Sequence, residues 1–388
     1  MNKPQWNYEL IATATFGLEA VVRREIEALG YSGIRTEDGK ITYEGDERAI
    51  VRSNLWLRSA DRVLIKLAEF HADSFEKLFD GIKVIAWEEF VPRDGRVIVT
   101  GTSVKSALHS LPACQRIGKK AIVDRLGDAY KLKVLPETGA DFVVKLTILK
   151  DRVTVTLDTS GEGLHKRGYR VRSVEAPIKE TLAAAMIELS FWNKERILVD
   201  PCCGSGTIPI EAAMMGMNIA PGLSRSFVSE TWGWIPKELW KEERSMALRE
   251  IKQEQKLRIF AGDIDERALE IAVENAVEAG VGDCIEFMSG DMSALKRLDD
   301  EDDVIIVSNP PYGKRIGEEE SMNAIYETYN YYLKKHHTWS LFLITADKDA
   351  EKKIRRKPAD RKRKLYNGRI ETCYYQFHGE RQKRIAEE

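Results

Sequence analysis

The sequence predicts an α/β protein in which an α+β region is followed by a doubly wound, mostly parallel sheet. Three observations lead to this prediction. With 388 residues, the chain is long enough for two or three domains. After Asp158, short strands and helices give way to long, regular β/α alternation. Near the end, an Asn-Gly turn at 367–368 joins two strands, so an antiparallel hairpin closes the sheet.

Short strands alternate with amphipathic helices up to about residue 160. Their apolar patterns predict strands at 8–14, 40–43, 63–70, 97–101, 141–149 and 153–157. Helical spacing predicts helices at 17–26, 47–57 and 116–126, another from Ser74, and an end to the first before Gly30. No nucleotide-binding motif occurs among these elements, so we predict a plain α+β region.

The second part contains five apolar runs that are typical of buried parallel strands. They predict strands at 197–200, 257–262, 284–288, 303–307 and 340–345, with helices at 181–192, 266–279 and 322–335 between them. The closing hairpin is expected from 364–369 and 371–377. The predicted sheet is therefore mostly parallel, with an antiparallel edge.

Composition narrows the class of protein. Hydrophobic residues make up 43% of the chain and charged residues 31%, as in soluble globular proteins. No apolar run approaches the ~20 residues that cross a bilayer, and the opening residues lack a secretory pattern. The five cysteines form no CxxC pair, which argues against a disulfide framework or a zinc site. We expect a cytoplasmic protein with no membrane partner and no metal.

The net charge of −2 conceals two basic stretches. Lys105–Lys133 holds seven Lys or Arg against two Asp, and Lys352–Arg369 holds ten against one. Such a run usually forms only a solvated face. Two of them on a nearly neutral protein still leave room for a polyanion bound to one surface.

A glycine turn follows the first parallel strand, at Asp200-Pro201-Cys202-Cys203-Gly204-Ser205-Gly206-Thr207, just before a helix. Such a turn lets the backbone approach a ligand closely. It does not match the dinucleotide fingerprint, because Pro209 stands where the third glycine would be, and there is no Gly-Lys-Ser/Thr of a P-loop. The acid ahead of the turn suits a ligand that carries an amine.

Acidic residues also follow the next two strands. Asp263, with Ile264 after it, ends the second strand and can hold the two hydroxyls of a ribose. Asp291 follows the third strand and can accept a hydrogen bond from an adenine amino group. Asp265 and Asp291, taken singly, are more often helix N-caps. The three acids on successive strand ends, taken together, favour a cofactor site.

The fourth strand ends in Asn309-Pro310-Pro311-Tyr312. A structural interpretation exists, since prolines end strands and Asn tolerates turns. Together with the glycine turn and the acids, however, the arrangement resembles the class I methyltransferases that use S-adenosylmethionine. The segment 309–312 is similar to the motif of the branch that methylates planar amino nitrogens.

This resemblance implies a clamp for the target amine, whose lone pair is delocalised into its ring or carbonyl. The side-chain oxygen of Asn309 and the carbonyl of Pro310 can each accept one N–H and steer the lone pair toward the methyl group. The prolines fix these acceptors, and Tyr312 can stack on the base, a contact worth ~1–3 kcal/mol. Orientation contributes more than acid–base chemistry in such a transfer.

Further segments resemble the THUMP-containing RNA guanine-N2 methyltransferases, and most closely their bacterial 23S ribosomal RNA branch. These segments are 165–170 with 176–183, then 208–213, 218–222, 314–317 and, upstream, 111–122. The resemblance implies a ferredoxin-like domain at 1–65, a THUMP RNA-binding domain at 66–160 and a Rossmann-like methyltransferase domain at 161–388. S-adenosylmethionine is the implied cofactor and RNA the implied partner.

The resemblance and the strand-end pattern together name the candidate site residues. The amine clamp would be Asn309, Pro310, Pro311 and Tyr312. Cofactor binding is assigned to Glu180, Thr181, Asp200, Cys202, Gly204, Gly206, Thr207, Asp263, Ile264, Asp291 and Asn309. Contacts to RNA are assigned to Lys105, Arg116, Lys119, Lys120, His165, Lys166, Arg167 and Arg170.

Several alternatives stay open from the sequence. The substrate could be transfer RNA, or the chain could be an RNA-binding assembly factor with a vestigial methyl site. The excess segment 218–256, with Phe227, Trp232, Trp234 and Trp240, could be a lid over the base or an extra helical hairpin. The modified nucleotide, the choice between naked RNA and an assembling particle, and the oligomeric state are not specified by the sequence.

Overall fold

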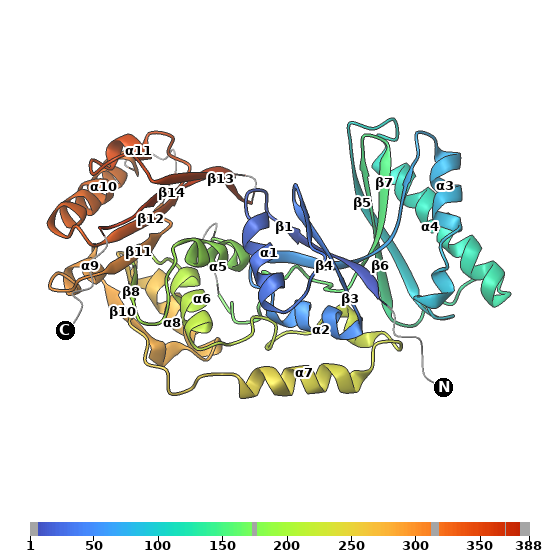
Figure 1. Cartoon of the computed structure of the whole chain (residues 1–388), viewed down its shortest axis with the longest axis horizontal. Coiled ribbons are helices and arrows are strands. Elements are labelled where there is room, and N and C mark those ends of the chain that lie inside the picture. The colour runs from blue at the N-terminus through green and yellow to red at the C-terminus, as the bar shows by residue number, and fades with distance from the viewer. Residues whose placement is uncertain (1–6, 173–176, 312–317, 369, 381–388) are drawn as a thin grey trace. The chain divides into compact units, whose positions relative to one another are not determined.

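The computed structural model describes residues 7–172, 177–311, 318–368 and 370–380 (Figure 1). The chain divides into two compact units, and each contains a piece of chain from the other's part of the sequence. The N-terminal unit consists of residues 1–14, 23–164 and 226–245. The C-terminal unit consists of residues 15–22, 165–225 and 246–388.

The elements of the N-terminal part follow the predicted alternation. They are β1 (Tyr8–Ala14), α1 (Glu19–Ala28), β2 (Arg35–Glu37), β3 (Lys40–Gly45), α2 (Glu47–Trp56), β4 (Ala60–His71), α3 (Phe75–Lys83), the 3-10 turn η1 (Trp87–Glu89), β5 (Arg96–Val104), α4 (Leu111–Tyr130), β6 (Asp141–Leu149) and β7 (Arg152–Asp158). Helix α4 is longer than predicted at both ends, and its Pro112 lies in the first turn, where a missing N–H costs nothing.

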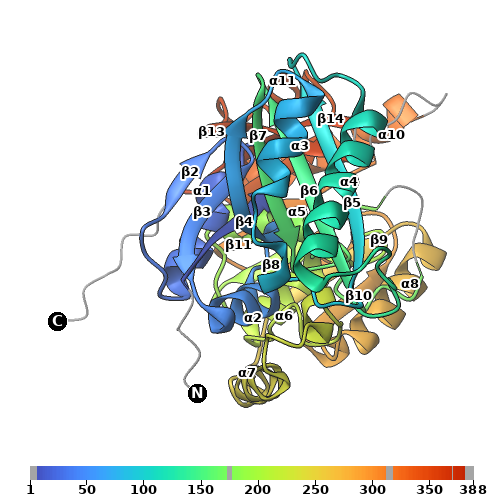
Figure 2. The same ribbon diagram turned by 90° about the vertical axis from the view of Figure 1, so that its right-hand side faces the viewer.

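One seven-stranded sheet runs through the N-terminal unit in the order β2-β3-β1-β4-β7-β6-β5. Its long central strand β4 pairs with β1 through residues such as Ile65 and with β7 as far as His71. The domain boundary expected at residue 65 therefore falls inside a strand that both halves share. Helices α3 and α4 cover one face of the strands β5 to β7 (Figure 2).

Residues 226–245 complete the N-terminal unit with buried aromatic side chains. The Trp232 ring, 1% exposed, stacks on Phe142 with 5.1 Å between ring centroids, and its indole N–H donates to the Asp141 carbonyl at 2.9 Å. The indole of Trp234 donates to the carbonyl of Phe90 at 3.0 Å. These side chains are committed to packing, so they are not lid residues that could cover a base.

Most of the remaining elements belong to the C-terminal unit. They are α5 (Glu180–Leu189), β8 (Ile197–Asp200), α6 (Thr207–Gly216), β9 (Ile259–Asp263), α8 (Glu266–Glu278), η3 (Gly282–Cys284), β10 (Ile285–Ser289), α9 (Ser293–Arg297), β11 (Val304–Ser308), α10 (Glu318–Lys335), β12 (Ser340–Thr345), α11 (Ala350–Lys353), β13 (Arg361–Asn367) and β14 (Ile370–Phe377). Between α6 and β9 lie η2 (Val228–Thr231) and α7 (Lys237–Arg249), one helix where a helical hairpin was considered.

The second sheet has the order β10-β9-β8-β11-β12-β14-β13. Strands β8 to β12 pair in parallel, whereas β14 runs antiparallel to both β12 and β13. The predicted fold class is confirmed: a mostly parallel sheet with a terminal antiparallel hairpin follows an α+β region. The strand order of this sheet reverses between β8 and β11, and open α/β sheets bind ligands at such a point.

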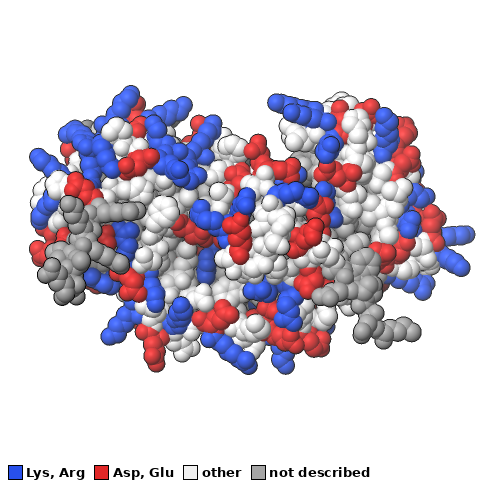
Figure 3. Space-filling model, viewed as in Figure 1, with Lys and Arg blue, Asp and Glu red and all other residues white. Residues whose placement is uncertain are grey.

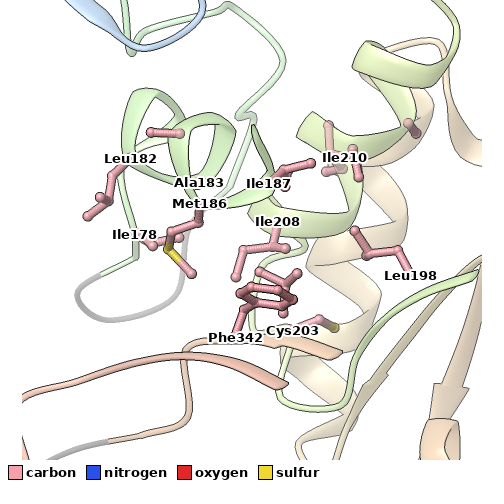
Figure 4. Packing of buried hydrophobic residues seen from close by; sticks show 14 of the residues in the cluster. Ile178, Leu182, Ala183, Met186, Ile187, Leu198, Cys203, Ile208, Ile210 and Phe342 are labelled. Atoms are coloured by element: carbon pink, nitrogen blue, oxygen red, sulfur yellow. The ribbon is translucent and has the colours of Figure 1, made fainter. Parts of the chain in front are cut away.

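A hydrophobic cluster supports the first parallel strand and the helices beside it. Its members include Leu198 of β8, Met186 of α5 and Ile208 of α6. Figure 4 shows Phe342 of β12 beside Cys203, which belongs to the glycine turn. The turn is therefore anchored to the core through a buried side chain next to the residues that were assigned to the cofactor.

Candidate active site

The parallel strands bring four predicted site residues to one edge of the second sheet. Asp200 ends β8 opposite Ala261 of β9, and Asp263 ends β9 opposite Ser289 of β10. Asp291 follows β10 by two residues, and Asn309 follows β11 directly. The carboxyl ends of parallel strands share an edge, so these side chains are brought together as the sequence order implied.

The glycine turn has a backbone that only glycine adopts without strain. Gly204 and Gly206 have φ angles of +55° and +79°. A Cβ on Gly206 would also lie 2.9 Å from the Cβ of Ala272 in α8, closer than real Cβ atoms come. The turn is therefore held close to helix α8, with its backbone N–H groups near the end of the strand.

Asp263 fastens this turn to the end of β9. One carboxylate oxygen accepts from the Gly204 N–H at 2.8 Å, and the other accepts from the Asp265 N–H at 2.9 Å. Each oxygen retains a further lone pair for a ligand hydroxyl. Ile264 is 73% exposed, an apolar side chain held in solvent beside this acid.

The other two acids of this edge differ from each other. Asp265 accepts from the Arg267 N–H at 3.0 Å and caps α8, so the capping interpretation holds for it. Asp291 is exposed and precedes Met292, the N-cap residue of α9, so it is not the cap itself. Asp291 is consequently the better candidate of the two for contacting a ligand.

Asp200 lies in the interior, 1% exposed. Burial raises the pKa of its carboxyl well above the ordinary range, with a smaller contribution from the negative charge of Asp263, while the Cys202 N–H and the Ser308 hydroxyl oppose the rise. The Tyr329 hydroxyl donates to the Ser308 oxygen at 2.9 Å. Burial likewise raises the pKa of the Cys202 thiol, which suits a packing residue rather than a thiolate.

The Asn309 side chain contains a buried oxygen that needs a donor. Within 7–172, 177–311, 318–368 and 370–380, its Oδ1 has no hydrogen-bond partner. A buried acceptor without a partner costs free energy, about 1–3 kcal/mol, so a ligand N–H there would be favoured. Pro310 is buried and Pro311 is exposed, whereas Tyr312 and residues 314–317 lie outside the described residues.

The start of α5 offers a second group of this kind. Thr181 is 1% exposed, and among the described parts of the chain its hydroxyl also has no hydrogen-bond partner. Glu180, beside it, is buried and forms an ion pair with Arg170. The orphaned Thr181 hydroxyl and the backbone N–H groups of the glycine turn fit a polar, amine-bearing cofactor.

Four of the residues expected to contact RNA lie in the N-terminal unit. Lys105 follows β5, and Arg116 and Lys120 lie on α4; all three are exposed. The Lys119 ammonium forms an ion pair with Glu137 at 2.8 Å. Lys105, Arg116 and Lys120 are therefore placed where they can meet a phosphate.

The other four residues belong to the segment 165–172, and the structure corrects one of them. Lys166 is exposed and His165 half-buried. Arg167 is 2% exposed and paired with Glu211 at 3.3 Å, so its guanidinium is not available to RNA. The sequence did not reveal this burial because Glu211 lies 44 positions away. The Arg170 guanidinium donates to the hydroxyls of Ser205 and Thr207 in the glycine turn.

Lys and Arg side chains gather over α11 and β13 (Figure 3), where the second basic stretch lies. Six of them form ion pairs with acids: Lys352 with Asp349, Lys353 with Asp347, Arg355 with Glu327, Lys357 with Asp360, Lys362 with Glu351 and Lys364 with Glu371. Much of this charge is therefore neutralised locally.

Three family models match consecutive parts of the chain. A RlmL ferredoxin-like domain matches residues 9–64, a THUMP domain matches 72–158, and an RMKL-like methyltransferase domain matches 167–376. Across the described part of the chain, no helix is long and apolar enough to span a membrane.

The chain is also similar to several whole proteins. It is 49% identical to "Putative RNA methyltransferase YpsC" of Bacillus subtilis (strain 168), over 95% of this chain and 96% of that protein. A solved structure from Listeria monocytogenes str. 4b F2365, described as a predicted N6-adenine-specific DNA methylase, is 47% identical, with a TM-score of 0.90 and 97% of each chain covered. The structure of SMU.472, a putative methyltransferase complexed with SAH, is 42% identical, with a TM-score of 0.90 over 99% of this chain and 100% of that one.

Proposed function

Because the chain belongs to the THUMP-containing RNA methyltransferases of the RMKL and RlmL type, we propose that it methylates the exocyclic N2 amine of a guanosine in 23S ribosomal RNA. The observation that carries the proposal is the buried Asn309 oxygen, which has no partner among the residues described. An amino group of a base supplies the N–H donor that this oxygen lacks. The choice of guanine N2 and of 23S RNA is supported by the resemblance of segments such as 165–170 to that branch.

The cofactor is S-adenosylmethionine, as the sequence predicted. When bound, it supplies an electrophilic methyl group. We propose that Asp263 and Ile264 hold its ribose and adenine, with Asp291 accepting from the adenine amino group. The turn Cys202–Thr207, with Asp200, Glu180 and Thr181, would meet its amino-acid end; the Thr181 hydroxyl is buried without a partner in the described ranges.

The clamp would act by orientation. Asn309 Oδ1 and the Pro310 carbonyl each accept one N–H of the target amine, which aligns the nitrogen lone pair away from the plane of those bonds. Fixing reactants in this way can supply several kcal/mol of the barrier. After transfer, the nitrogen carries one proton too many, and this proton leaves to water while the second N–H remains on the clamp. A ring in position 312 would stack on the base.

RNA would be held by exposed cations of the N-terminal unit. Lys105, Arg116 and Lys120 are exposed there, and a THUMP domain matches the chain around them. The same match favours RNA over DNA as the substrate, although one similar structure is described as a DNA methylase. RNA of the large ribosomal subunit also fits the cytoplasm that was expected from the sequence.

The decisive experiment compares total RNA from a strain that lacks the gene with RNA from its parent. Nucleoside mass spectrometry should show loss of N2-methylguanosine at one position of 23S RNA, and the purified enzyme should restore it. A loss confined to transfer RNA would change the substrate. An unchanged set of modified nucleosides, with a ribosome assembly defect, would favour the assembly-factor alternative.

A further inference from the structure

We propose that Arg170 is a positioning residue for the cofactor-binding turn and not a contact to RNA. The inference rests on the proposed placement of S-adenosylmethionine at this edge of the sheet. It assigns to the segment 165–172 a role that its basic composition does not suggest. Lys166, which is exposed, stays a candidate for a phosphate contact.

The Arg170 guanidinium joins two walls of the candidate site. Its Nη1 donates to the Ser205 hydroxyl at 2.9 Å and its Nη2 to the Thr207 hydroxyl at 2.8 Å, so it grips the turn on both sides of Gly206. Its Nε donates to Glu180 at 2.8 Å, at the first residue of α5.

A fourth hydrogen bond completes the arrangement. Nη2 also donates to the Ile178 carbonyl at 3.3 Å, just before α5 begins. A guanidinium has five N–H donors, and these contacts use four of them. Little donor capacity therefore remains for a phosphate, and the planar group holds α5 and the turn in one geometry.

Burial makes the arrangement costly to disturb. The side chain of Arg170 is 19% exposed and that of Glu180 is 6% exposed. Without the arginine, Glu180 would be a buried carboxylate that has lost its partner. The turn and the start of α5 would then shift or admit water, and the cofactor would meet a site that is no longer preformed.

Arg172 provides a matched control two residues away. Its side chain is 57% exposed, and its ion pair with Glu274, which is 48% exposed, is 3.3 Å long. Exposed pairs of this kind contribute little. Arg172→Ala removes the same charge from the same segment without touching the turn.

The test measures cofactor and RNA binding separately in the full-length protein. Calorimetry with S-adenosylmethionine and S-adenosylhomocysteine should give an about 10- to 100-fold higher Kd for Arg170→Ala, the range expected for lost hydrogen bonds to a charged group. Arg170→Lys should recover only part of the cofactor affinity, since an ammonium reaches fewer acceptors. The cofactor Kd of Arg172→Ala should match that of the wild type. RNA affinity and its salt dependence should be unchanged in Arg170→Ala.

Activity adds a readout that a loss of stability alone would not give. The KM for the cofactor should rise in Arg170→Ala, whereas kcat at saturating cofactor should stay within about threefold of wild type, as for a loss of uniform binding. If Arg170→Ala does not fold, Arg170→Lys decides, and an unchanged cofactor Kd in it overturns the inference.

Two other outcomes have different meanings. Normal cofactor binding in Arg170→Ala, with a weaker and less salt-dependent RNA affinity, would return Arg170 to the RNA-contacting group. A wild-type protein that binds neither S-adenosylmethionine nor S-adenosylhomocysteine would instead contradict the proposed function itself.

Discussion

In the described part of the chain the two sheets have seven strands each, yet they present polar side chains in different ways. In the C-terminal unit, the strands β8 to β12 run parallel, so successive strand ends place Asp200, Asp263 and Asn309 on one edge. Among the described residues of the N-terminal unit, only the β5–β6 pair is parallel, so strand ends alternate between edges. Its candidate RNA contacts accordingly lie on a helix and a loop.

This difference shows where function can be located from strand order. A parallel sheet gathers the residues that follow its strands at one edge. These residues can be predicted from the sequence once the strands are located. A mostly antiparallel sheet gives no such guidance, so its binding residues must be sought from charge and exposure. Substitutions in the two units are therefore expected to have different effects.

The largest expected effect concerns the stability of the N-terminal unit. Trp232→Ala removes a buried ring and the hydrogen bond to Asp141, so unfolding should become easier by about 3–5 kcal/mol. Chemical denaturation followed by circular dichroism measures the change. Phe75→Ala, at an aromatic residue that is 37% exposed, should cost far less. Equal losses would show that residues 226–245 do not help to hold this unit together.

The next effect concerns the edge of the parallel sheet. Asn309→Ala should leave the cofactor Kd nearly unchanged but slow single-turnover methyl transfer by about 10²-fold or more, since the oriented lone pair matters most in the transition state. Rapid-quench kinetics at saturating cofactor separate binding from transfer. A normal rate of methyl transfer would mean that the segment 309–312 only ends the strand.

Two acids on that edge give a sharper comparison. Asp263→Ala should weaken cofactor binding by about 1.5–3 kcal/mol, because a carboxylate that binds both the turn and a ribose is lost. Asp265→Ala should instead cost about 1 kcal/mol of stability, since Asp265 caps α8. Calorimetry measures the cofactor affinity of both variants, and denaturation measures their stability. Equal changes in both quantities for the two variants would refute these assignments.

Smaller effects are expected when cations of the N-terminal unit are removed one at a time. Lys105→Ala, Arg116→Ala and Lys120→Ala should each weaken RNA binding and lower its salt slope by up to about 0.7–0.9, as for one lost phosphate contact. Filter binding at several salt concentrations measures both. Point substitutions are preferable to deleting residues 1–160, because residues 226–245 belong to the same unit. Unchanged salt slopes would show that these residues do not contact RNA phosphates.

The smallest effect is a change in pH dependence at Asp200. Its pKa is raised by burial, so the folded state holds this proton more tightly than the unfolded state does. Its stabilising contribution is present below the ordinary aspartate pKa of about 4 and is lost as pH rises through the raised value. Asp200→Asn should show a flatter curve over that window, measured by urea unfolding, whereas parallel curves would contradict the assigned burial effect.

Much of the fold was predictable because its signals are local. Apolar runs marked the five parallel strands, and Asn367-Gly368 marked the hairpin. The strand-end residues of the candidate site followed from the same runs, because the carboxyl ends of parallel strands lie at one edge of the sheet whatever the order of the strands. What could not be predicted depended on partners far away in the sequence.

Arg167 and Arg170 illustrate this limit. Both lie in a basic segment, where cations usually face solvent, yet Glu211 lies 44 positions from Arg167 and Thr207 lies 37 from Arg170. Trp232 likewise packs on Phe142, 90 positions earlier in the sequence. Burial of a charged or aromatic side chain by a distant partner leaves no periodic trace in the sequence, so only the three-dimensional packing revealed these contacts.

The placement of residues 226–245 also has a consequence for synthesis of the protein. A nascent chain folds as it leaves the ribosome, at about 5–20 residues per second. The N-terminal sheet is complete in sequence by Asp158, but the tryptophans that finish its core come from Ser226–Ser245. From Leu164 to Ser245 the ribosome needs about 4–16 seconds at that speed, and during this interval the surface around Phe142 is uncovered. Slow codons or truncated messages within this span would leave a partly folded intermediate that chaperones must protect.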